Sequence, residues 1–333
     1  MKGDEMNTLL PGLNEIESAS RLIYRSMPAT PQYSWPLINA RASAEVWVKH
    51  ENHTQVGAFK VRGGLIYMDS LRREQPGVTT LVSATRGNHG QSLAFAAAQY
   101  GLRVVVVVPY GNSVEKNGAM RALGAELVEF GHDFQAASEH AVLLERENGW
   151  HRVPNFDLQL VTGVSTYALE LFSACPELDT MYVPIGMGSG VCGTIAARNA
   201  LGLATKIVGV VSSQAPAYAL SFAANEAIEH EARSVVADGM ACRKPDISAL
   251  EIMRAGMDRV VMVEDDEVKD AMRAYFVDTH NVAEGAGAAG LAGLLKDRAA
   301  GGKRVGTVLT GGNVDSEMFA EVLLGDRVVS LAG

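Results

Sequence analysis

Short runs of β-branched residues alternate with stretches of helical spacing from residue 79 onwards, and this alternation constrains the fold more than any other feature. Residues 79–84 (TTLVSA), 103–109 (RVVVVVP) and 126–130 (ELVEF) read as strands, with helices expected near 89–100 and 134–148. Strands that alternate with helices build βαβ units and parallel sheets whose strands are buried on both faces. The sequence therefore predicts an α/β fold.

A second series of expected strands lies at 180–185, 206–211, 259–263 and 305–310. A less regular stretch, residues 155–166 (NFDLQLVTGVST), lies between the two series. Two series of strands indicate two α/β lobes with a cleft between them, which is where open sheets bind ligands.

The composition argues against several classes of function. A net charge of −9 without a basic block disfavours nucleic acid as a partner. No apolar run reaches the roughly 20 residues that a membrane span needs, and the N-terminus lacks a hydrophobic signal core. The three cysteines, Cys175, Cys192 and Cys242, have no metal-ligand spacing. We therefore expect a cytoplasmic protein with no membrane partner.

Lys60 is the first candidate for chemistry. It follows Phe59 directly and lies among small residues that include Gly57, Gly63 and Gly64. A desolvated lysine loses its proton more readily and becomes a nucleophile toward aldehydes. The alternative is a solvated charge at a helix end, which is the usual state of a lysine.

Residues 83–91 (SATRGNHGQ) join an expected strand to an expected helix. Gly87 and Gly90 permit unusual backbone angles, and Thr85 and Asn88 supply short polar side chains. Backbone amides at a helix entrance favour an anion such as a carboxylate. The alternative is a simple polar turn that caps the helix.

Residues 185–193 (IGMGSGVCG) form a second glycine-rich connection between a strand and a helix, suited to binding a phosphate. Gly188, Gly190 and Gly193 also match the dinucleotide fingerprint, which expects an acidic residue after the next strand. That strand, residues 206–211, runs into two serines and no acid. A nicotinamide-dependent oxidoreductase is therefore the weaker interpretation, and a phosphate site with another cargo is the stronger one.

Thr310 would present a neutral hydroxyl from the end of the last strand, within residues 309–315 (LTGGNVD), unless this stretch is only a glycine turn. Four strand-end loops thus offer a lysine, a site for an anion, a site for a phosphate and a hydroxyl. Chance explains that joint pattern poorly.

With these segments in this order, the chain resembles the fold-type II (tryptophan synthase β-like) enzymes that depend on pyridoxal 5′-phosphate. It looks most like the branch of threonine/serine dehydratases, serine racemase and 3-hydroxyaspartate dehydratases. The resemblance runs from about residue 20 to the C-terminus. It implies that each chain has two open parallel-sheet lobes with the cofactor in the cleft between them, and that two identical chains form a homodimer. Residues 1–70 and 156–333 would form the large cofactor-binding lobe, and residues 71–155 a small lobe with the substrate carboxylate loop.

The resemblance also implies roles for individual residues. Lys60 would bind the cofactor covalently, and Phe59 would pack against its ring. Asn88 would bond the phenolic oxygen of the cofactor, and Thr310 would face its pyridine nitrogen. The other implied cofactor contacts are Asn155, Gly186, Met187, Gly188, Ser189, Gly190, Gly239 and Glu284. The implied substrate-binding residues are Thr85, Arg86, Gly87, Asn88 and His89.

The chain departs from the pattern of that branch in two respects. Arg86 stands where serine racemase-like members have a serine, and arginine is a poor proton shuttle, so we expect elimination rather than racemisation. Arg86 either reaches a β-substituent of the substrate, such as a carboxylate, or points outward and pairs with an acid. Val211 and Ala217 stand where some relatives have carboxylate ligands, so we expect no metal there.

The expected function is a pyridoxal-phosphate-dependent ammonia-lyase that removes water from a β-hydroxy-α-amino acid of the threonine/serine type, giving a 2-oxo acid and ammonia. The substrates 3-hydroxyaspartate, phenylserine and a hydroxyectoine-derived amino acid stay open. The remaining alternative is a cofactor-binding protein without catalysis, although the presence of Lys60, Asn88 and Thr310 together argues against it.

Overall fold

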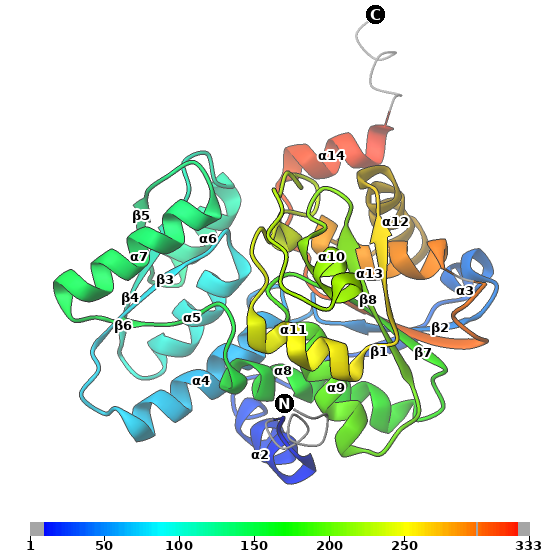
Figure 1. Ribbon diagram of the computed structural model, residues 1–333, viewed down its shortest axis with the longest axis horizontal. Helices are drawn as coiled ribbons and strands as arrows, with labels where there is room; N and C mark the ends of the chain where they lie inside the picture. Colours follow the sequence, from blue (N-terminus) through cyan, green and yellow to red (C-terminus); the bar gives the residue numbers. More distant parts are fainter. Residues whose placement is uncertain (1–9, 298, 326–333) are drawn as a thin grey trace, which may run out of the picture.

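The computed structural model describes residues 10–297 and 299–325, which form an α/β structure with two separate sheets (Figure 1). The larger sheet has six strands, and its edge strand β1 runs antiparallel to β2 whereas the others are parallel. In spatial order its strands are β1 (Gln32–Ser34), β2 (Glu45–His50), β10 (Arg304–Leu309), β7 (Thr180–Pro184), β8 (Lys206–Ser212) and β9 (Arg259–Val263).

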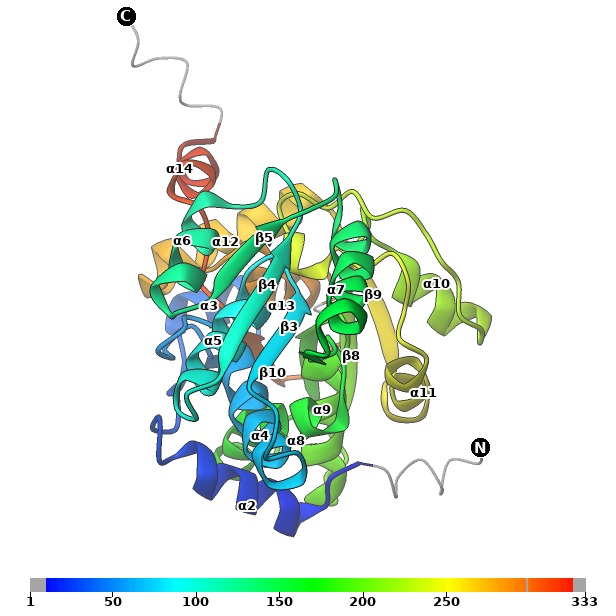
Figure 2. The ribbon, with the colours of Figure 1, turned by 90° about the vertical axis from the view of Figure 1, so that its left-hand side faces the viewer.

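The smaller sheet is fully parallel and is buried on both faces (Figure 2). In spatial order its strands are β5 (Glu126–Glu129), β4 (Arg103–Val108), β3 (Thr80–Ala84) and β6 (His151–Arg152). Alternate valines of β4 face opposite ways: Val105 and Val107 pack toward Ala137 and Ala141, and Val106 packs in the cluster on the other face. This burial explains the continuous apolar run in the sequence.

Helices cover both faces of the larger sheet. One face packs in a hydrophobic cluster with α8, α9 and α11, and the other packs with α3, α12 and α13. The helices have the bounds α2 (Leu13–Ile23), α3 (Pro36–Ala42), α4 (Lys60–Glu74), α5 (Asn88–Ala98), α6 (Val114–Ala122), α7 (Phe134–Asn148), α8 (Leu158–Ala174), α9 (Ser189–Ala200), α10 (Ala217–Ala224), the 3-10 helix η1 (Asp238–Met240), α11 (Ile247–Gly256), α12 (Asp265–Thr279), α13 (Gly285–Lys296) and α14 (Ser316–Leu324).

The expected strands from residue 79 onwards and the α/β fold class are confirmed. The less regular stretch at 155–166 is mostly helical, because α8 begins inside it, where the Asp157 side chain accepts a hydrogen bond from the Gln159 amide. The glycine that weakens the helical pattern has a packing role. A Cβ atom at Gly163 would lie 2.2 Å from the Arg62 carbonyl oxygen, so only glycine lets α8 approach α4 this closely.

A group of charged residues, the Arg62 cluster (Lys49, Glu51, Arg62 and Glu170), joins the end of β2 to α4 and α8; Glu170 is partly buried and the other three are fully buried. The Arg62 guanidinium donates to Glu51 at 2.7 Å and to Glu170 at 2.6 Å. Lys49 donates to the other oxygen of Glu170 at 2.5 Å. Burial lowers the pKa of Lys49 and Glu170 acts in the opposite direction, so the two cations and two carboxylates compensate one another.

The substitution Arg62→Met should lower the free energy of unfolding by about 3–5 kcal/mol, because two buried carboxylates lose their shared partner. Urea denaturation followed by circular dichroism would measure the loss. Lys296→Met removes only a half-exposed pair with Glu267 and is the matched control, with an expected change below about 1 kcal/mol. Similar losses in the two variants would contradict the structural role of the Arg62 cluster.

Candidate active site

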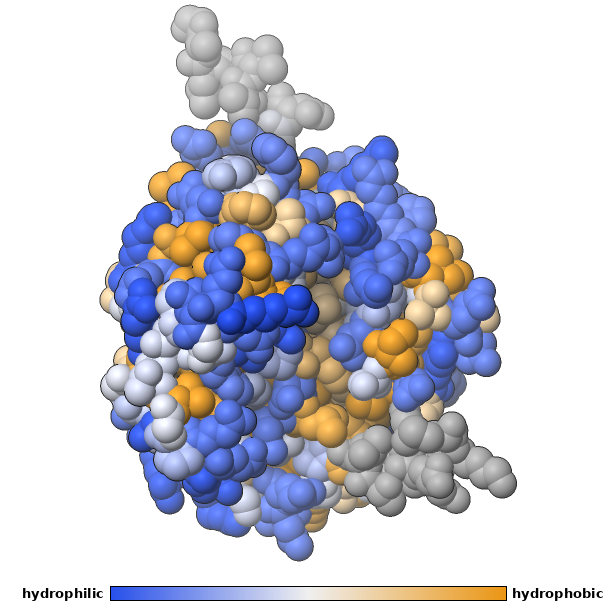
Figure 3. Space-filling view, turned by 60° about the vertical axis from the view of Figure 1, so that its left-hand side comes forward, coloured by the Kyte–Doolittle hydropathy of each residue, from blue (hydrophilic) through white to orange (hydrophobic). Residues whose placement is uncertain are grey.

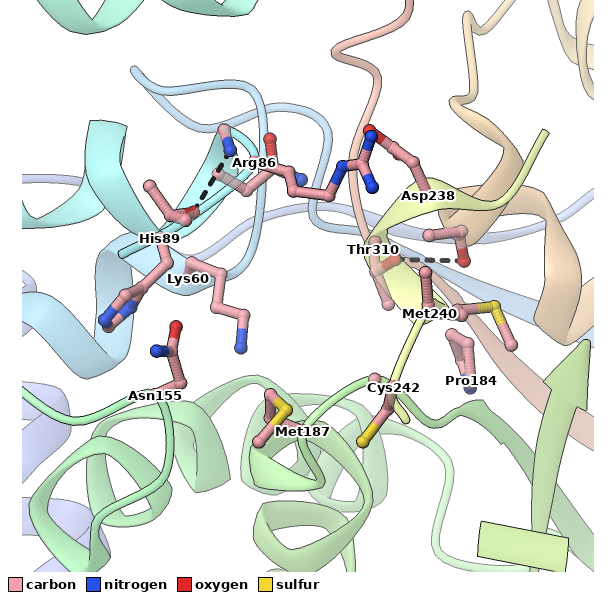
Figure 4. Close-up of a pocket in the computed structure, with 18 of the residues that line it drawn as sticks. Lys60, Arg86, His89, Asn155, Pro184, Met187, Asp238, Met240, Cys242 and Thr310 are labelled. Atoms are coloured by element: carbon pink, nitrogen blue, oxygen red, sulfur yellow. Dashed lines mark hydrogen bonds between the residues drawn. The ribbon is translucent and has the colours of Figure 1, made fainter. Parts of the chain in front are cut away.

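Every site residue named from the sequence lines one pocket between the two sheets (Figure 4). These residues are Phe59, Lys60, Thr85, Arg86, Gly87, Asn88, His89, Asn155, Gly186, Met187, Gly188, Ser189, Gly190, Gly239, Glu284 and Thr310. The pocket lies where β3, β7 and β10 end, since Thr85, Gly186 and Thr310 follow these strands closely. Their chemical roles stay predictions, but the structure places them together.

The pocket adjoins a second cavity of about 760 Å³, with which it shares Arg86, Phe134, Asn155, Met187, Ala241 and Cys242. Figure 3 shows the molecular surface hollowed here, with apolar side chains toward the base of the hollow. The two cavities therefore adjoin each other.

Backbone pairing brings Lys60 next to Thr310. The Phe59 amide donates to the Thr310 carbonyl at 2.9 Å, and Ala58 forms an antiparallel bridge with Gly311. Lys60 is the first residue of α4, so its side chain starts directly beside this backbone pairing. The Thr310 hydroxyl is buried and donates to the Ala286 carbonyl at 3.3 Å, which leaves it a neutral group at the pocket wall.

The Lys60 amine has the environment of a nucleophile rather than of a surface charge. It donates to the Ser189 hydroxyl at 3.1 Å, and within the described part of the chain no carboxylate forms an ion pair with it. Burial of the amine lowers the pKa of Lys60 to about 8. Near neutral pH a useful fraction of Lys60 is therefore unprotonated.

The glycine-rich loop after β7 approaches its neighbours too closely for side chains. Gly188 has a φ of +104°, and a Cβ atom there would lie 2.7 Å from the Met253 methyl carbon. A Cβ atom at Gly186 would lie 2.5 Å from the Gly239 carbonyl oxygen. Helix α9 begins at Ser189, so its free amides and positive end meet this loop, as a phosphate group requires.

The loop 85–89 leads into α5, whose first amides have no acceptor within the helix. The Thr85 hydroxyl accepts from the Gly87 amide at 3.1 Å and fixes the turn. His89 is 5% exposed, and burial together with the charge of Lys60 lowers its pKa to about 3. A neutral His89 supplies no positive charge, so a bound carboxylate would depend on the amides and hydroxyl of this loop.

Arg86 reaches across the pocket instead of pointing outward. Figure 4 shows its guanidinium directed toward Asp238. Its Nε atom is buried without a hydrogen-bond partner, and no ion pair of Arg86 is present among residues 10–297 and 299–325. The alternative of a surface ion pair therefore does not describe the structure.

Three residues that the sequence did not indicate, Lys116, Asp238 and Asn313, also belong to this region. Asn88 donates to Glu284 at 2.5 Å and accepts from Asn313 at 2.8 Å, while Lys116 pairs with Asp238 at 2.9 Å. Asp238 directly precedes Gly239, which the sequence did indicate, so the position of Gly239 could have pointed to Asp238 as a pocket residue. Lys116 lies in an ordinary helical pattern, and nothing local distinguishes it from a surface lysine.

Two further features bear on possible ligands. In the described residues, no group of three or more His, Cys, Asp or Glu side chains could hold a metal ion. No helix in that part of the chain is both long and apolar enough to cross a membrane.

The residues of the pocket fit pyridoxal 5′-phosphate. Lys60 offers an amine of lowered pKa for the aldehyde, and the glycine loop at the start of α9 offers amides for the phosphate. Thr310 offers a neutral hydroxyl for the pyridine nitrogen. These three groups line one pocket, so a single ligand can meet all of them.

Comparison with known proteins gives relatives across nearly the whole chain. The L-threonine ammonia-lyase of Thermotoga maritima is 30% identical over 312 residues, which are 93% of this chain and 78% of that protein. The L-threonine ammonia-lyase of Geobacter sulfurreducens is 35% identical over 281 residues, which are 84% of this chain and 69% of that protein.

A solved structure of a pyridoxal 5′-phosphate-dependent aspartate racemase superposes with a TM-score of 0.87 at 26% identity, covering 92% of this chain and 97% of that one. The family model described as pyridoxal-phosphate dependent enzyme matches residues 25–311. These matches agree with the lysine, the glycine loop and the hydroxyl in the pocket. The chain belongs to the family of pyridoxal-phosphate dependent enzymes.

Proposed function

We propose that the protein is an ammonia-lyase that removes water from a β-hydroxy-α-amino acid of the threonine/serine type. The observation that carries the proposal is the contrast between Lys60, which has a lowered pKa and no ion-pair partner, and Arg86 on the facing loop. Lys60 can exchange a proton, whereas arginine stays protonated. Relatives named L-threonine ammonia-lyase support the same reaction.

Different groups of the pocket act on the cofactor, the substrate Cα and the substrate carboxylate. Bound pyridoxal phosphate supplies an electron sink for the charge that develops on the substrate Cα. The free amine of Lys60 accepts the Cα proton at Nζ, and the amides at the start of α5 orient the substrate carboxylate. The β-hydroxyl group leaves as water after it receives this proton from the Lys60 ammonium group. The released enamine then hydrolyses to a 2-oxo acid and ammonia.

Thr310 favours elimination over transamination in this proposal. Its hydroxyl is neutral, so it cannot keep a pyridine nitrogen protonated as an aspartate would. The charge at Cα is then less delocalised, and prompt loss of the β-hydroxyl is favoured.

The test of the proposed function uses the purified protein with its cofactor and a panel of β-hydroxyamino acids. We expect a visible absorbance band from the cofactor bound to Lys60, a change in that band with threonine or serine, and release of a 2-oxo acid. Lys60→Ala should lose both the band and the activity. A parent protein that carries the cofactor but is inert on the whole panel would contradict the proposal and support a non-catalytic role.

The pKa of Lys60 gives a pH dependence for cofactor capture. When pyridoxal phosphate is added to cofactor-free protein, the rate of band formation should rise about tenfold per pH unit below the pKa, because only the unprotonated amine attacks an aldehyde. The rise should level off above about pH 8, where Lys60 is mostly neutral. Stopped-flow absorbance would measure the rates. A profile that keeps rising to the usual pKa of a lysine would show that the amine is not desolvated.

An anionic β-substituent on the substrate is a second candidate, because Arg86 lines the pocket without an ion-pair partner. Arg86→Ala should then lower kcat/KM for 3-hydroxyaspartate by about tenfold more than for threonine, since a charge-assisted hydrogen bond is lost with only one of them. Arg86→Lys, which keeps the charge, is the matched variant and should lose less. An equal effect of Arg86→Ala on the two substrates would exclude the second candidate.

We also propose that the enzyme works as a homodimer in the cytoplasm. Exposed apolar side chains near the edge strand β1, Tyr33 and Leu37, are compatible with a partner subunit there. A native mass of about 35 kDa, that of one chain, would contradict the dimer.

A further inference from the structure

Behind Asn88, a continuous series of contacts runs along the wall of the pocket; we call it the Asn88 network. Lys116 pairs with both oxygens of Asp238, at 3.0 and 2.9 Å, and lies 3.4 Å from one oxygen of Glu284. The other oxygen of Glu284 accepts from Asn88 at 2.5 Å. The Asn88 carbonyl oxygen accepts from Asn313 at 2.8 Å. The network therefore starts at a cation and ends at the amide of Asn88.

The direction of these hydrogen bonds fixes which atoms Asn88 can offer. A side-chain amide has two N–H groups, and Asn313 uses its nitrogen for the Val56 carbonyl at 2.8 Å and for Asn88. The Asn88 oxygen is thus committed as an acceptor. Its nitrogen has one N–H on Glu284 and one that remains, so Asn88 can present a donor toward the pocket.

An ionised Glu284 favours this orientation, because a carboxylate can only accept and forms the stronger, charge-assisted hydrogen bond with the Asn88 N–H. Glu284 is 3% exposed, and its pKa is raised because burial outweighs the opposing effect of the Lys116 charge. Lys116 is itself 8% exposed. Burial disfavours its charge, but Glu284 and Asp238 outweigh burial and raise the pKa of Lys116. Lys116 is therefore the buried positive charge that offsets the cost of an ionised Glu284.

Lys116 also connects parts of the chain that belong to different sheets. It lies on α6, beside the smaller sheet, whereas Asp238 and Glu284 precede α13 on the larger one. Its aliphatic stem lies under the substrate loop, since a Cβ atom at Gly87 would be 2.6 Å from the Lys116 Cδ atom. One side chain thus touches both the carboxylate loop and the network that orients Asn88.

We propose that Lys116 is a positioning residue that, by holding Glu284 ionised, makes Asn88 present an N–H to the phenolic oxygen of the cofactor. The proposal rests on the role of Asn88 toward the cofactor in the proposed function. A donor at that oxygen stabilises its negative charge. Lys116 would therefore set the affinity for the cofactor and its spectrum without touching the reacting atoms.

The experiment compares the cofactor-loaded protein with Lys116→Met, which removes the charge but keeps an aliphatic stem. We expect cofactor retention about tenfold weaker, the scale seen when a ligand residue loses its outer partner, and a shifted pH midpoint of the cofactor absorbance band. Lys116→Arg keeps the charge and should restore most of both properties. Lys296→Met, which removes a lysine paired with Glu267 away from the pocket, should match the parent.

A double-variant cycle with Glu284→Gln separates the proposed action from general destabilisation. If Lys116 acts through the charge of Glu284, Lys116→Met should add little to the spectral change already caused by Glu284→Gln. Parent-like retention and spectrum in Lys116→Met, or fully additive changes, would overturn the proposal. If Lys116→Met does not fold, an unchanged band in Glu284→Gln overturns it and a shifted band supports it.

Failure of this proposal and failure of the proposed function give different results. A parent protein that carries the cofactor but is inert on hydroxyamino acids contradicts the reaction and leaves the spectral comparison intact. A parent that eliminates water while Lys116→Met keeps the parental spectrum contradicts only the positioning role.

Discussion

The Arg62 cluster is the constraint on which the position of Lys60 depends. Arg62 lies two residues after Lys60, in the first turn of α4, and its guanidinium is held by carboxylates from β2 and α8. If the Arg62 guanidinium moved away from its partners, unpaired charges would remain inside the protein. Rotation of α4 about its axis would therefore cost a large amount of free energy. The direction in which Lys60 leaves the helix is therefore fixed by charges that face away from the pocket.

The fold could be predicted where the local sequence pattern indicates a buried element. It could not be predicted where burial of a residue depends on a partner far away in the sequence. Strand β4 consists of valines after its first residue, and a run of this kind has few other uses than a strand buried on both faces. The sequence gives no such signal for β2, which ends in Lys49 and His50, both fully buried. Lys49 is tolerated there only because Glu170, 121 positions later in the chain, lies beside it.

The same distinction applies to the candidate site. Residues that closely follow strands, such as Thr85, Gly186 and Thr310, could be predicted as site residues. The carboxyl ends of parallel strands lie at the same edge of the sheet, where ligands bind. Lys116 could not, since its partner Asp238 lies 122 positions away and its own helix has no special pattern. The direction of the Arg86 side chain was equally open, because a loop residue can turn either way without changing the motif around it.

The close approach of α8 to its neighbours has a consequence for the size of ligand that the pocket accepts. Gly163 lets α8 touch the backbone of α4, and a Cβ atom at Gly193 of α9 would lie 2.9 Å from the Ser165 amide on the other side of α8. Lys60 begins α4 and Ser189 begins α9, so the separation of these two helices is set by α8, which has glycine at its contacts with both. Backbones in contact cannot move closer, and they cannot separate without opening a void. The room for a ligand between Lys60 and the glycine loop is therefore fixed by α8, of which no residue lines the pocket.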